Sequence, residues 1–428
     1  MASLFRPKMF RHSSPPAAGG SRSVPSLFKP LRQEYDSGVK TCRTDACLFL
    51  TLLLGLPLLG AWLGGKPVSD YLDFPPRAMS VQHEPFSWPV FLGLALVILL
   101  TIGPIVLRVW SANFRSSSLL PQSPSFAPQH SPLTTQHFVL PWWGWLGMGW
   151  TALWWLLAWT RFPWMAPLQE HTFTPLWLGY VVVVNAWTCA RTGHCMMRDR
   201  PRYFLSLFPL SVLLWWLFEY LNRFSQNWFY AGVADLSSLE YFVRGSIPFS
   251  TVLPAVLGTA ELLTSYPRLS AGLERCEALK IHRPELVGWS LAILSSVGLV
   301  GIGLWPDYLF PLVWVGPLSL LVSLQLLAGR PTIFSPLAQG DWRGLWVAAL
   351  AALMCGFWWE LWNAKSLAHW QYAIPFVERF RLFEMPILGY AGYLPFGLEC
   401  LAFADFCLSR KFSAGVNYYA ERQAGGPI

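Results

Sequence analysis

The chain has 428 residues, of which 54% are apolar and only 13% are charged, and its formal net charge is +8. A soluble domain usually carries about 25% charged residues, and the apolar residues here stand in long blocks, so we exclude a soluble globule. The strands of a membrane barrel alternate in pieces of about ten residues, which these continuous blocks do not match. The positive charge fits loops beside anionic membrane lipids and gives no indication of nucleic acid.

Long apolar blocks predict membrane-spanning helices, because about 20 residues at about 1.5 Å each cross a hydrocarbon core of about 30 Å. The sequence therefore predicts an all-α integral membrane protein with about ten spans. In chain order they are Ala46–Gly64, Trp88–Val109, Trp142–Trp159, Phe173–Ala190, Tyr203–Asn222, Ile247–Ser265, Val287–Leu304, Tyr308–Ala328, Leu345–Asn363 and Met385–Leu408.

Positively charged residues gather on one side of these spans. If the N-terminus is in the cytoplasm, 23 of the 31 Lys and Arg residues fall in cytoplasmic segments and 8 fall outside. Lys and Arg favour the cytoplasmic side of a membrane. We therefore expect a multi-pass protein of a bacterial inner membrane with both termini in the cytoplasm.

The segments between the spans differ in composition. Residues 1–45 form a basic arm rich in Ser and Pro, which is typical of disorder, and residues 46–110 form a two-helix membrane segment. Residues 111–141 resemble a Ser- and Pro-rich linker, and residues 409–428 form a polar tail. The first apolar run follows a long arm and is not followed by a cleavage site of small residues, so we expect a retained anchor.

The last eight predicted spans contain one pattern written twice. Glu219–Asn222, Trp228, Tyr230, Glu240, Pro248 and Glu261 of a first unit match Glu360–Asn363, Trp370, Tyr372, Glu378, Pro386 and Glu399 of a second. The units cover residues 142–266 and 284–408, with four spans each. An even number of spans returns the chain to its starting side, so the two units must have the same orientation, related by an axis along the membrane normal.

The repeated Glu-x-x-Asn is the first candidate site. Residues three apart share a helix face, so Glu219 lies beside Asn222 and Glu360 beside Asn363 near the outer ends of their spans. Carboxylates in membrane segments are costly and usually face a partner, a cavity or water. The following loops bring further residues over this end as candidate substrate contacts: Trp228, Tyr230, Glu240, His369, Trp370, Tyr372 and Glu378. Alternatively, these Glu residues lie at headgroup level and only support packing.

Glu261 and Glu399 form a second candidate polar site. Each follows its matched Pro by 13 residues, about 20 Å along a helix, so we expect them toward the cytoplasmic side, far from Glu219 and Glu360. They are either steps in a polar path or isolated carboxylates with local partners. Four consecutive residues cannot all face one ion, so residues 194–197 do not predict a metal site, and we expect no cofactor. The Gly- and Pro-rich run 383–397 predicts a kinked start to the last span.

The amino-acid sequence of the second unit resembles a family of uncharacterised bacterial multi-pass membrane proteins. The residues that carry this resemblance are Trp358–Asn363, Phe383–Pro386 and Leu394–Phe396, and it covers about a quarter of the chain. It implies the membrane fold and brings no activity with it. Small membrane carotenoid cyclases and hydratases also use membrane Glu residues in duplicated helical units, which is a likeness of architecture alone because their motifs are not matched.

Three functions remain open from the sequence. In the first, the protein binds or modifies a lipid-like substrate, such as an isoprenoid, between the two units, with Glu360 as acid or base and Asn363 orienting it. In the second, it is a transporter or channel in which the Glu residues mark a proton or cation path. In the third, it is a scaffold without catalysis. The expected partners are membrane lipids and a hydrophobic small molecule.

Overall fold

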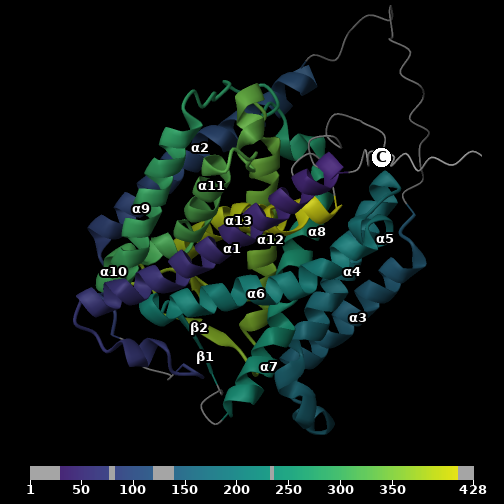
Figure 1. Ribbon diagram of the computed structural model, residues 1–428. Helices are drawn as coiled ribbons and strands as arrows, with labels where there is room; N and C mark the ends of the chain where they lie inside the picture. The colour runs from purple at the N-terminus through teal and green to yellow at the C-terminus, as the bar shows by residue number, and fades with distance from the viewer. Residues whose placement is uncertain (1–28, 77–81, 119–138, 232–235, 413–428) are drawn as a thin grey trace, which may run out of the picture. The chain divides into compact units, whose positions relative to one another are not determined.

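The computed structural model describes residues 29–76, 82–118, 139–231 and 236–412. The chain divides into two units, Met1–Leu48 and Phe49–Ile428, and the elements that position the candidate site belong to the second. The described residues are mostly helical, with two short pairs of strands (Figure 1).

The α-helices follow one another along most of the chain. They are α1 (Lys29–Leu63), α2 (Trp88–Ser118), α3 (Trp142–Trp159), α4 (Phe173–Thr192), α5 (Met196–Asp199), α6 (Pro201–Ser225), α7 (Ser238–Phe249), α8 (Val252–Thr264), α9 (Pro284–Leu304), α10 (Pro306–Leu309), α11 (Gly316–Leu327), α12 (Arg343–Asn363) and α13 (Tyr393–Phe412). Proline opens α6, α9 and α10, a position where its missing N–H has no helical partner to lose.

Short 3-10 helices and strands join these helices. The 3-10 helices are η1 (Val68–Tyr71), η2 (Pro163–His171), η3 (Pro267–Ser270), η4 (Phe310–Val313), η5 (Ser335–Gln339) and η6 (Ile387–Gly392). The strands are β1 (Trp228–Tyr230), β2 (Trp370–Tyr372), β3 (Arg381–Leu382) and β4 (Met385–Pro386). Strands β1 and β2 pair with each other, as do β3 and β4, and both pairs are antiparallel.

Eight helical segments of the described chain are long and apolar enough to cross a membrane, and a bent pair can add a ninth. The bent pair, Pro306–Val313 and Gly316–Leu327, turns by 54° where the sequence predicted one span over 308–328. The predicted span Trp142–Trp159 is the helix α3 but is not among the eight. Its seven Trp and three Gly residues lower its mean hydropathy although none of its residues is charged.

Several predicted boundaries differ from the observed elements. The predicted span over 247–265 is a longer segment, Ser238–Thr264, made of α7 and α8. The last span begins with the 3-10 turn η6 and becomes α-helical at Tyr393. Helix α1 begins at Lys29, inside the arm expected to lack structure, and α2 and α13 extend into the predicted linker and tail. The rest of those segments, 1–28, 119–138 and 413–428, lies outside the described residues.

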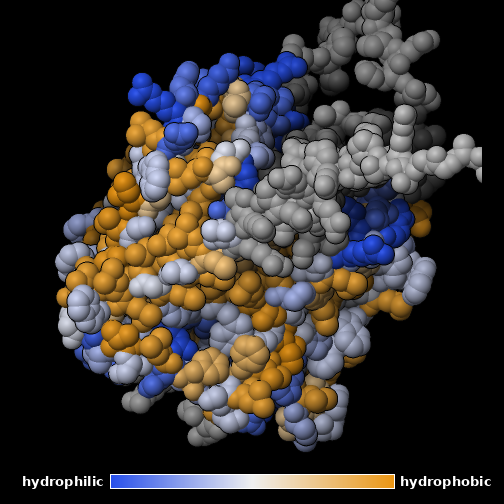
Figure 2. Space-filling view, viewed as in Figure 1, coloured by the Kyte–Doolittle hydropathy of each residue, from blue (hydrophilic) through white to orange (hydrophobic). Residues whose placement is uncertain are grey.

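Helix α8 is the centre of the core. Every residue from Val252 to Leu262 is buried, because α4, α6, α12 and α13 all pack against it. A helix that is apolar on all sides is suited to this central position. The outer helices instead expose large apolar side chains, and Figure 2 shows that hydrophobic residues cover much of the visible face.

Glycines allow two helices of the core to approach closely at Gly397. A Cβ atom added at Gly397 in α13 would lie 2.1 Å from the carbonyl oxygen of Ala348 in α12, so only glycine permits this crossing. The close approach of α12 and α13 brings Glu360 and Tyr393 of the candidate site within reach of each other.

Candidate functional site

A cavity of about 350 Å³ lies where α6 and α12 end and the strands β1 and β2 begin. Its volume is within the range of about 300–1,000 Å³ that is typical of small-molecule sites. Eleven of its 25 lining residues are aromatic: Phe173, Trp215, Trp228, Tyr230, Tyr241, Phe249, Trp314, Trp359, Trp370, Tyr372 and Tyr393. The cavity therefore offers a ligand an interior rich in aromatic rings.

Strands β1 and β2 lie side by side (Figure 1), and residues of both strands line this cavity. In their antiparallel register, Trp228 lies opposite Tyr372 and Tyr230 lies opposite Trp370. Directly opposed residues share one face of such a pair, as do alternate residues along a strand. These four predicted substrate contacts consequently project together, and all four line the cavity.

Asn222 and Asn363 hold the starts of these strands. The side chain of Asn222 donates to the carbonyl of Trp228 over 2.7 Å and accepts from the N–H of Asn227 over 2.8 Å. Asn363 donates to the carbonyl of Trp370 over 2.7 Å and accepts from its N–H over 2.8 Å. Both amides thus position the strand that follows their helix, rather than the neighbouring Glu as the sequence suggested.

Glu219 lies directly behind the first strand. Its Oε1 accepts hydrogen bonds from the indole N–H of Trp215 at 2.9 Å, the indole N–H of Trp228 at 3.0 Å and the hydroxyl of Tyr230 at 2.6 Å. All three donors line the cavity, whereas Glu219 itself does not. The carboxylate acts on the cavity through these side chains.

Glu360 occupies the matching position behind the second strand and is fully buried. Its Oε1 accepts from the hydroxyls of Tyr372 and Tyr393, both at 2.7 Å, and the indole N–H of Trp370 donates to the Tyr372 oxygen over 2.8 Å. Among the described residues, Oε2 of Glu360 has no hydrogen-bond partner. Two buried carboxylates therefore lie behind one aromatic cavity.

The tyrosines on the strands keep their protons. Burial and the nearby carboxylate of Glu219 raise the pKa of Tyr230 well above its usual value. Burial and the carboxylate of Glu360 do the same to the pKa of Tyr372. Each hydroxyl thus remains a hydrogen-bond donor to its carboxylate, and its oxygen can still accept a hydrogen bond, as the Tyr372 oxygen does from the indole N–H of Trp370.

Polar side chains gather at the outer edge of the cavity. Arg244 of α7 donates to Glu170 of η2 over 2.8 Å, and about half of each side chain is exposed. His171 and His369 also line this edge. Trp215 lies ten residues before the end of α6, which places it about 15 Å deeper along the helix. The cavity is therefore polar where it opens and aromatic at depth.

Two of the predicted substrate contacts lie away from the cavity lining. Glu240 caps the start of α7, where its carboxylate accepts from the N–H and hydroxyl of Ser237 at 3.0 and 2.7 Å. Glu378 pairs with Arg381 on the exposed surface. The alignment of the two copies put these Glu residues at matching positions, but each has a local partner of its own.

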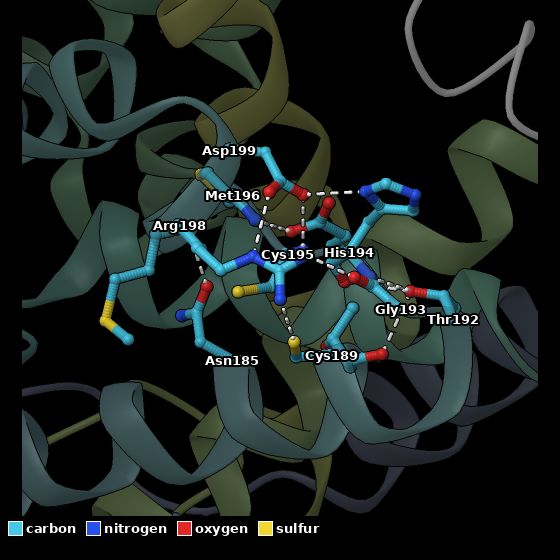
Figure 3. A network of polar contacts seen from close by, with 12 residues as sticks. Asn185, Cys189, Thr192, Gly193, His194, Cys195, Met196, Arg198 and Asp199 are labelled. Carbon is cyan, nitrogen blue, oxygen red and sulfur yellow. Dashed lines mark hydrogen bonds and ion pairs between the residues drawn. The ribbon is translucent and has the colours of Figure 1, made fainter. Parts of the chain in front are cut away.

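Glu261 belongs to a separate network around α5. Its Oε2 accepts from the N–H of Met196 over 2.8 Å, and Asn185 accepts from the N–H of Met197 over 3.1 Å. Asp199 closes the same loop by accepting from the Cys195 N–H at 3.0 Å and contacting His194 at 3.1 Å (Figure 3). These bonds satisfy the free N–H groups at the start of a short helix.

The remaining residues of the second polar site and of the 194–197 loop also lie apart from the cavity lining. Glu399 is buried, and its Oε2 has no partner among the described residues. Burial raises the pKa of Cys195 to about 12, so this sulfur stays a neutral thiol, whereas metals bind the thiolate. Within the described ranges, no group of three or more His, Cys, Asp or Glu is arranged so that it could hold a metal ion.

Most of the lining residues were not predicted as contacts from the sequence, among them Trp215, Trp314, Trp359 and Tyr393. Trp215 precedes Glu219 by four residues, a helical spacing that places the two side chains on one face. Trp359 and Tyr393 had no such signal, because their approach depends on how α12 packs against α13. Trp314 lies in the break between Pro306–Val313 and Gly316–Leu327, and the centres of its ring and the Trp228 ring are 5.7 Å apart.

These features describe a mostly helical chain with the apolar helices of a multi-pass membrane protein and an aromatic cavity at one end of its core. No family model matches the chain, and no curated protein and no solved structure was found to match it.

Proposed function

We propose that this protein binds and modifies a lipid-like substrate in the aromatic cavity between its two four-span units, residues 142–266 and 284–408. The observation that carries the proposal is the convergence of Trp228, Tyr230, Trp370 and Tyr372 on one cavity backed by two buried carboxylates. A cavity with many aromatic rings and several polar side chains suits an amphiphile, because the rings bury its apolar part and the polar side chains contact the rest.

We further propose that the two halves arose by duplication and are related by a twofold axis. The sequence matches Trp228 with Trp370 and Tyr230 with Tyr372. A twofold axis through the centre of a strand pair makes equivalent strands antiparallel, and the register centred on Phe229 and Gln371 has this form. A shared ancestry explains why each half supplies one carboxylate and one aromatic strand.

The chemistry proposed for the site is acid–base catalysis by Tyr–Glu pairs. Tyr372 and Tyr230 face the cavity while their hydroxyl protons point to Glu360 and Glu219. A substrate proton can pass to a tyrosine oxygen as the tyrosine proton passes to its carboxylate, so that each buried Glu acts as the base through its tyrosine. Asn363 and Asn222 act in this scheme by fixing the strands.

The competing functions make different demands on the cavity. A transport path was expected to link Glu219 or Glu360 with Glu261 or Glu399, but neither of the latter is among the residues that line the cavity. A scaffold needs no cavity at this position. The lipid-like ligand is therefore the function that the geometry supports best.

The proposal is tested by identifying the compounds that purify together with the protein. We expect a hydrophobic compound in extracts of the wild type that is depleted in Ala368→Trp, because Ala368 is an exposed residue of the cavity lining and an indole there fills the mouth. Ala278→Trp, at an exposed position outside the lining, is the matched control. Equal amounts in all three proteins, measured by mass spectrometry, would contradict the proposal.

A further inference from the structure

Five donor groups of the cavity lining already donate to the two buried carboxylates. The hydroxyl of Tyr230 and the indole N–H groups of Trp215 and Trp228 all point to Glu219. The hydroxyls of Tyr372 and Tyr393 point to Glu360. A tyrosine that donates its only proton offers a ligand lone pairs alone. A ligand group seated on these tyrosines must therefore supply the proton or positive charge itself.

The two carboxylates lack a close cationic partner. Within the described ranges, no Lys, Arg or His nitrogen lies within 4.0 Å of Glu219 or Glu360. Arg223 is one turn from Glu219, but its guanidinium donates to the carbonyls of Tyr71 and Asp73. A buried carboxylate without a counter-ion is costly. The attraction of both carboxylates would therefore favour the binding of a cation in the cavity.

The cavity walls favour the same kind of group. Aromatic faces attract cations through the negative charge density of their rings, most strongly in tryptophan. Trp228 and Trp314 stand side by side here, with ring centres 5.7 Å apart. The indole N–H groups of Trp314 and Trp359 are not bonded to either carboxylate, so they can donate to an acceptor elsewhere on the ligand. The only arginine of the lining, Arg244, is already paired with Glu170, which leaves little attraction for an anion.

We propose that the ligand of this cavity is an amphiphile whose positively charged nitrogen group sits at depth against Tyr230, Tyr372 and Tyr393, with its apolar part along the aromatic walls. This inference rests on the proposed function, because it names the chemical class of the ligand for the same site. Glu219 and Glu360 supply the balancing negative charge through the tyrosines, and neither carboxylate needs to touch the ligand.

The experiment compares three soluble probes with one chain length: octyltrimethylammonium, octyldimethylamine oxide and octyl sulfate. Binding to the purified full-length protein in a neutral detergent is measured by calorimetry. We expect the ammonium probe to bind about tenfold more tightly than the amine oxide, as one or two cation–π contacts and a nearby charge predict, and the sulfate to bind most weakly.

Variants locate the source of this preference. Glu360→Gln and Glu219→Gln should each reduce it, whereas Glu399→Gln, which replaces a buried carboxyl group outside the cavity lining, should leave it unchanged. Tyr372→Phe serves as a second test at the same place if a Gln variant does not fold. Size-exclusion profiles report on folding in every case.

The outcomes separate this inference from the function on which it rests. If the ammonium and amine oxide bind equally while Ala368→Trp weakens both, the cavity holds amphiphiles but the cationic preference is wrong. If the preference persists when both Glu residues are replaced, it is also wrong. If Ala368→Trp changes the binding of no probe and removes no co-purified compound, the proposed function itself fails.

Discussion

Trp228 lies opposite Tyr372 in the β1–β2 pair, so an indole that donates to Glu219 stands beside a hydroxyl that donates to Glu360. Two carboxylates that are 141 positions apart in the sequence are thereby joined by one small sheet. Because this sheet is only three residues long on each side, its geometry depends on the side chains that anchor it.

Replacing Glu360 with Gln should leave the protein folded and abolish its activity. Gln has nearly the same shape and its amide oxygen can still accept from Tyr372 and Tyr393, but it cannot take a proton as a carboxylate does. We expect wild-type protein levels, with ligand binding weakened about tenfold, because the negative charge behind Tyr372 and Tyr393 is lost. Expression level, size-exclusion profile and ligand affinity are the measurements. Loss of folded protein would instead support the scaffold function.

Replacing Tyr372 with Phe should lower both stability and ligand affinity. The change removes one of the two donors to the buried Oε1 of Glu360 and leaves Tyr393 as the other. A hydrogen bond to a charged group contributes about 1.5–3 kcal/mol, and Tyr393 offsets part of this loss, so we expect destabilisation of about 1–2 kcal/mol. Denaturant unfolding of the purified protein measures it. Tyr390→Phe is the control, since its exposed hydroxyl bonds only a carbonyl at 3.2 Å.

Replacing Gly356 with Ala should disturb Tyr393. A Cβ atom at Gly356 would lie 2.3 Å from the ring of Tyr393, so the ring must move away from Glu360. We expect a loss of about 1–3 kcal/mol, the usual effect of overpacking, together with weaker ligand binding.

Gly344→Ala in the same helix is the matched control for Gly356→Ala. Nothing lies within 4 Å of a Cβ atom there, and alanine favours a helix over glycine by up to about 1 kcal/mol. Thermal unfolding should therefore show opposite shifts for the two variants. Two similar shifts would mean that the packing of Tyr393 against α12 is not as described.

Replacing Asn363 with Ala should loosen β2. Both backbone polar groups of Trp370 would lose their partner, and unpaired groups of this kind cost about 1–3 kcal/mol. Asn222→Ala should have an effect of similar size on β1, and each variant should weaken ligand binding. Hydrogen exchange at the N–H of Trp370 provides the local measurement. Unchanged protection of that N–H in Asn363→Ala would contradict the assignment of this side chain as the anchor of β2.

Acid should weaken the loop around α5 through Asp199. Burial alone would raise the pKa of Asp199, but hydrogen bonds from Arg198 and the Cys195 N–H, with the charge of Arg198, hold it below its ordinary value of 3.8. A carboxyl group with a lowered pKa in the folded state stabilises the fold above its unfolded pKa of about 4. This contribution is lost as the pH falls through the folded-state value.

The substitution Asp199→Asn tests this pH dependence. We expect the variant to unfold at a lower temperature than the wild type at pH 7, and the difference to shrink below about pH 4, where the wild-type carboxyl group also becomes protonated. Glu170→Gln, on the exposed surface, is the control. A difference that does not change with pH would show that the hydrogen-bond geometry, and not the charge, stabilises the loop.

The apolar helices could be found from the sequence because membrane crossing depends on length and composition, which are local properties. The exceptions have local causes as well. Helix α3 is rich in tryptophan, so hydropathy underestimates it, and Pro311 and Pro317 stand at the bend that divides the span predicted over 308–328. Glu240 shows that a repeated position does not reveal a residue's role. Its place in the repeat predicted a substrate contact, but its carboxylate accepts a hydrogen bond from Ser237, three residues earlier.

The two matching sets of residues can be recognised without coordinates, because the pattern that ends in Trp-x-Tyr after Glu-x-x-Asn occurs twice along the chain. The contacts between the two sets depend on the folded arrangement of the helices. The bonds from Tyr393 to Glu360 and the pairing of Trp228 with Tyr372 join segments that are tens to more than a hundred positions apart. Such contacts depend on how helices cross, and the crossing depends on side-chain shape over the whole core.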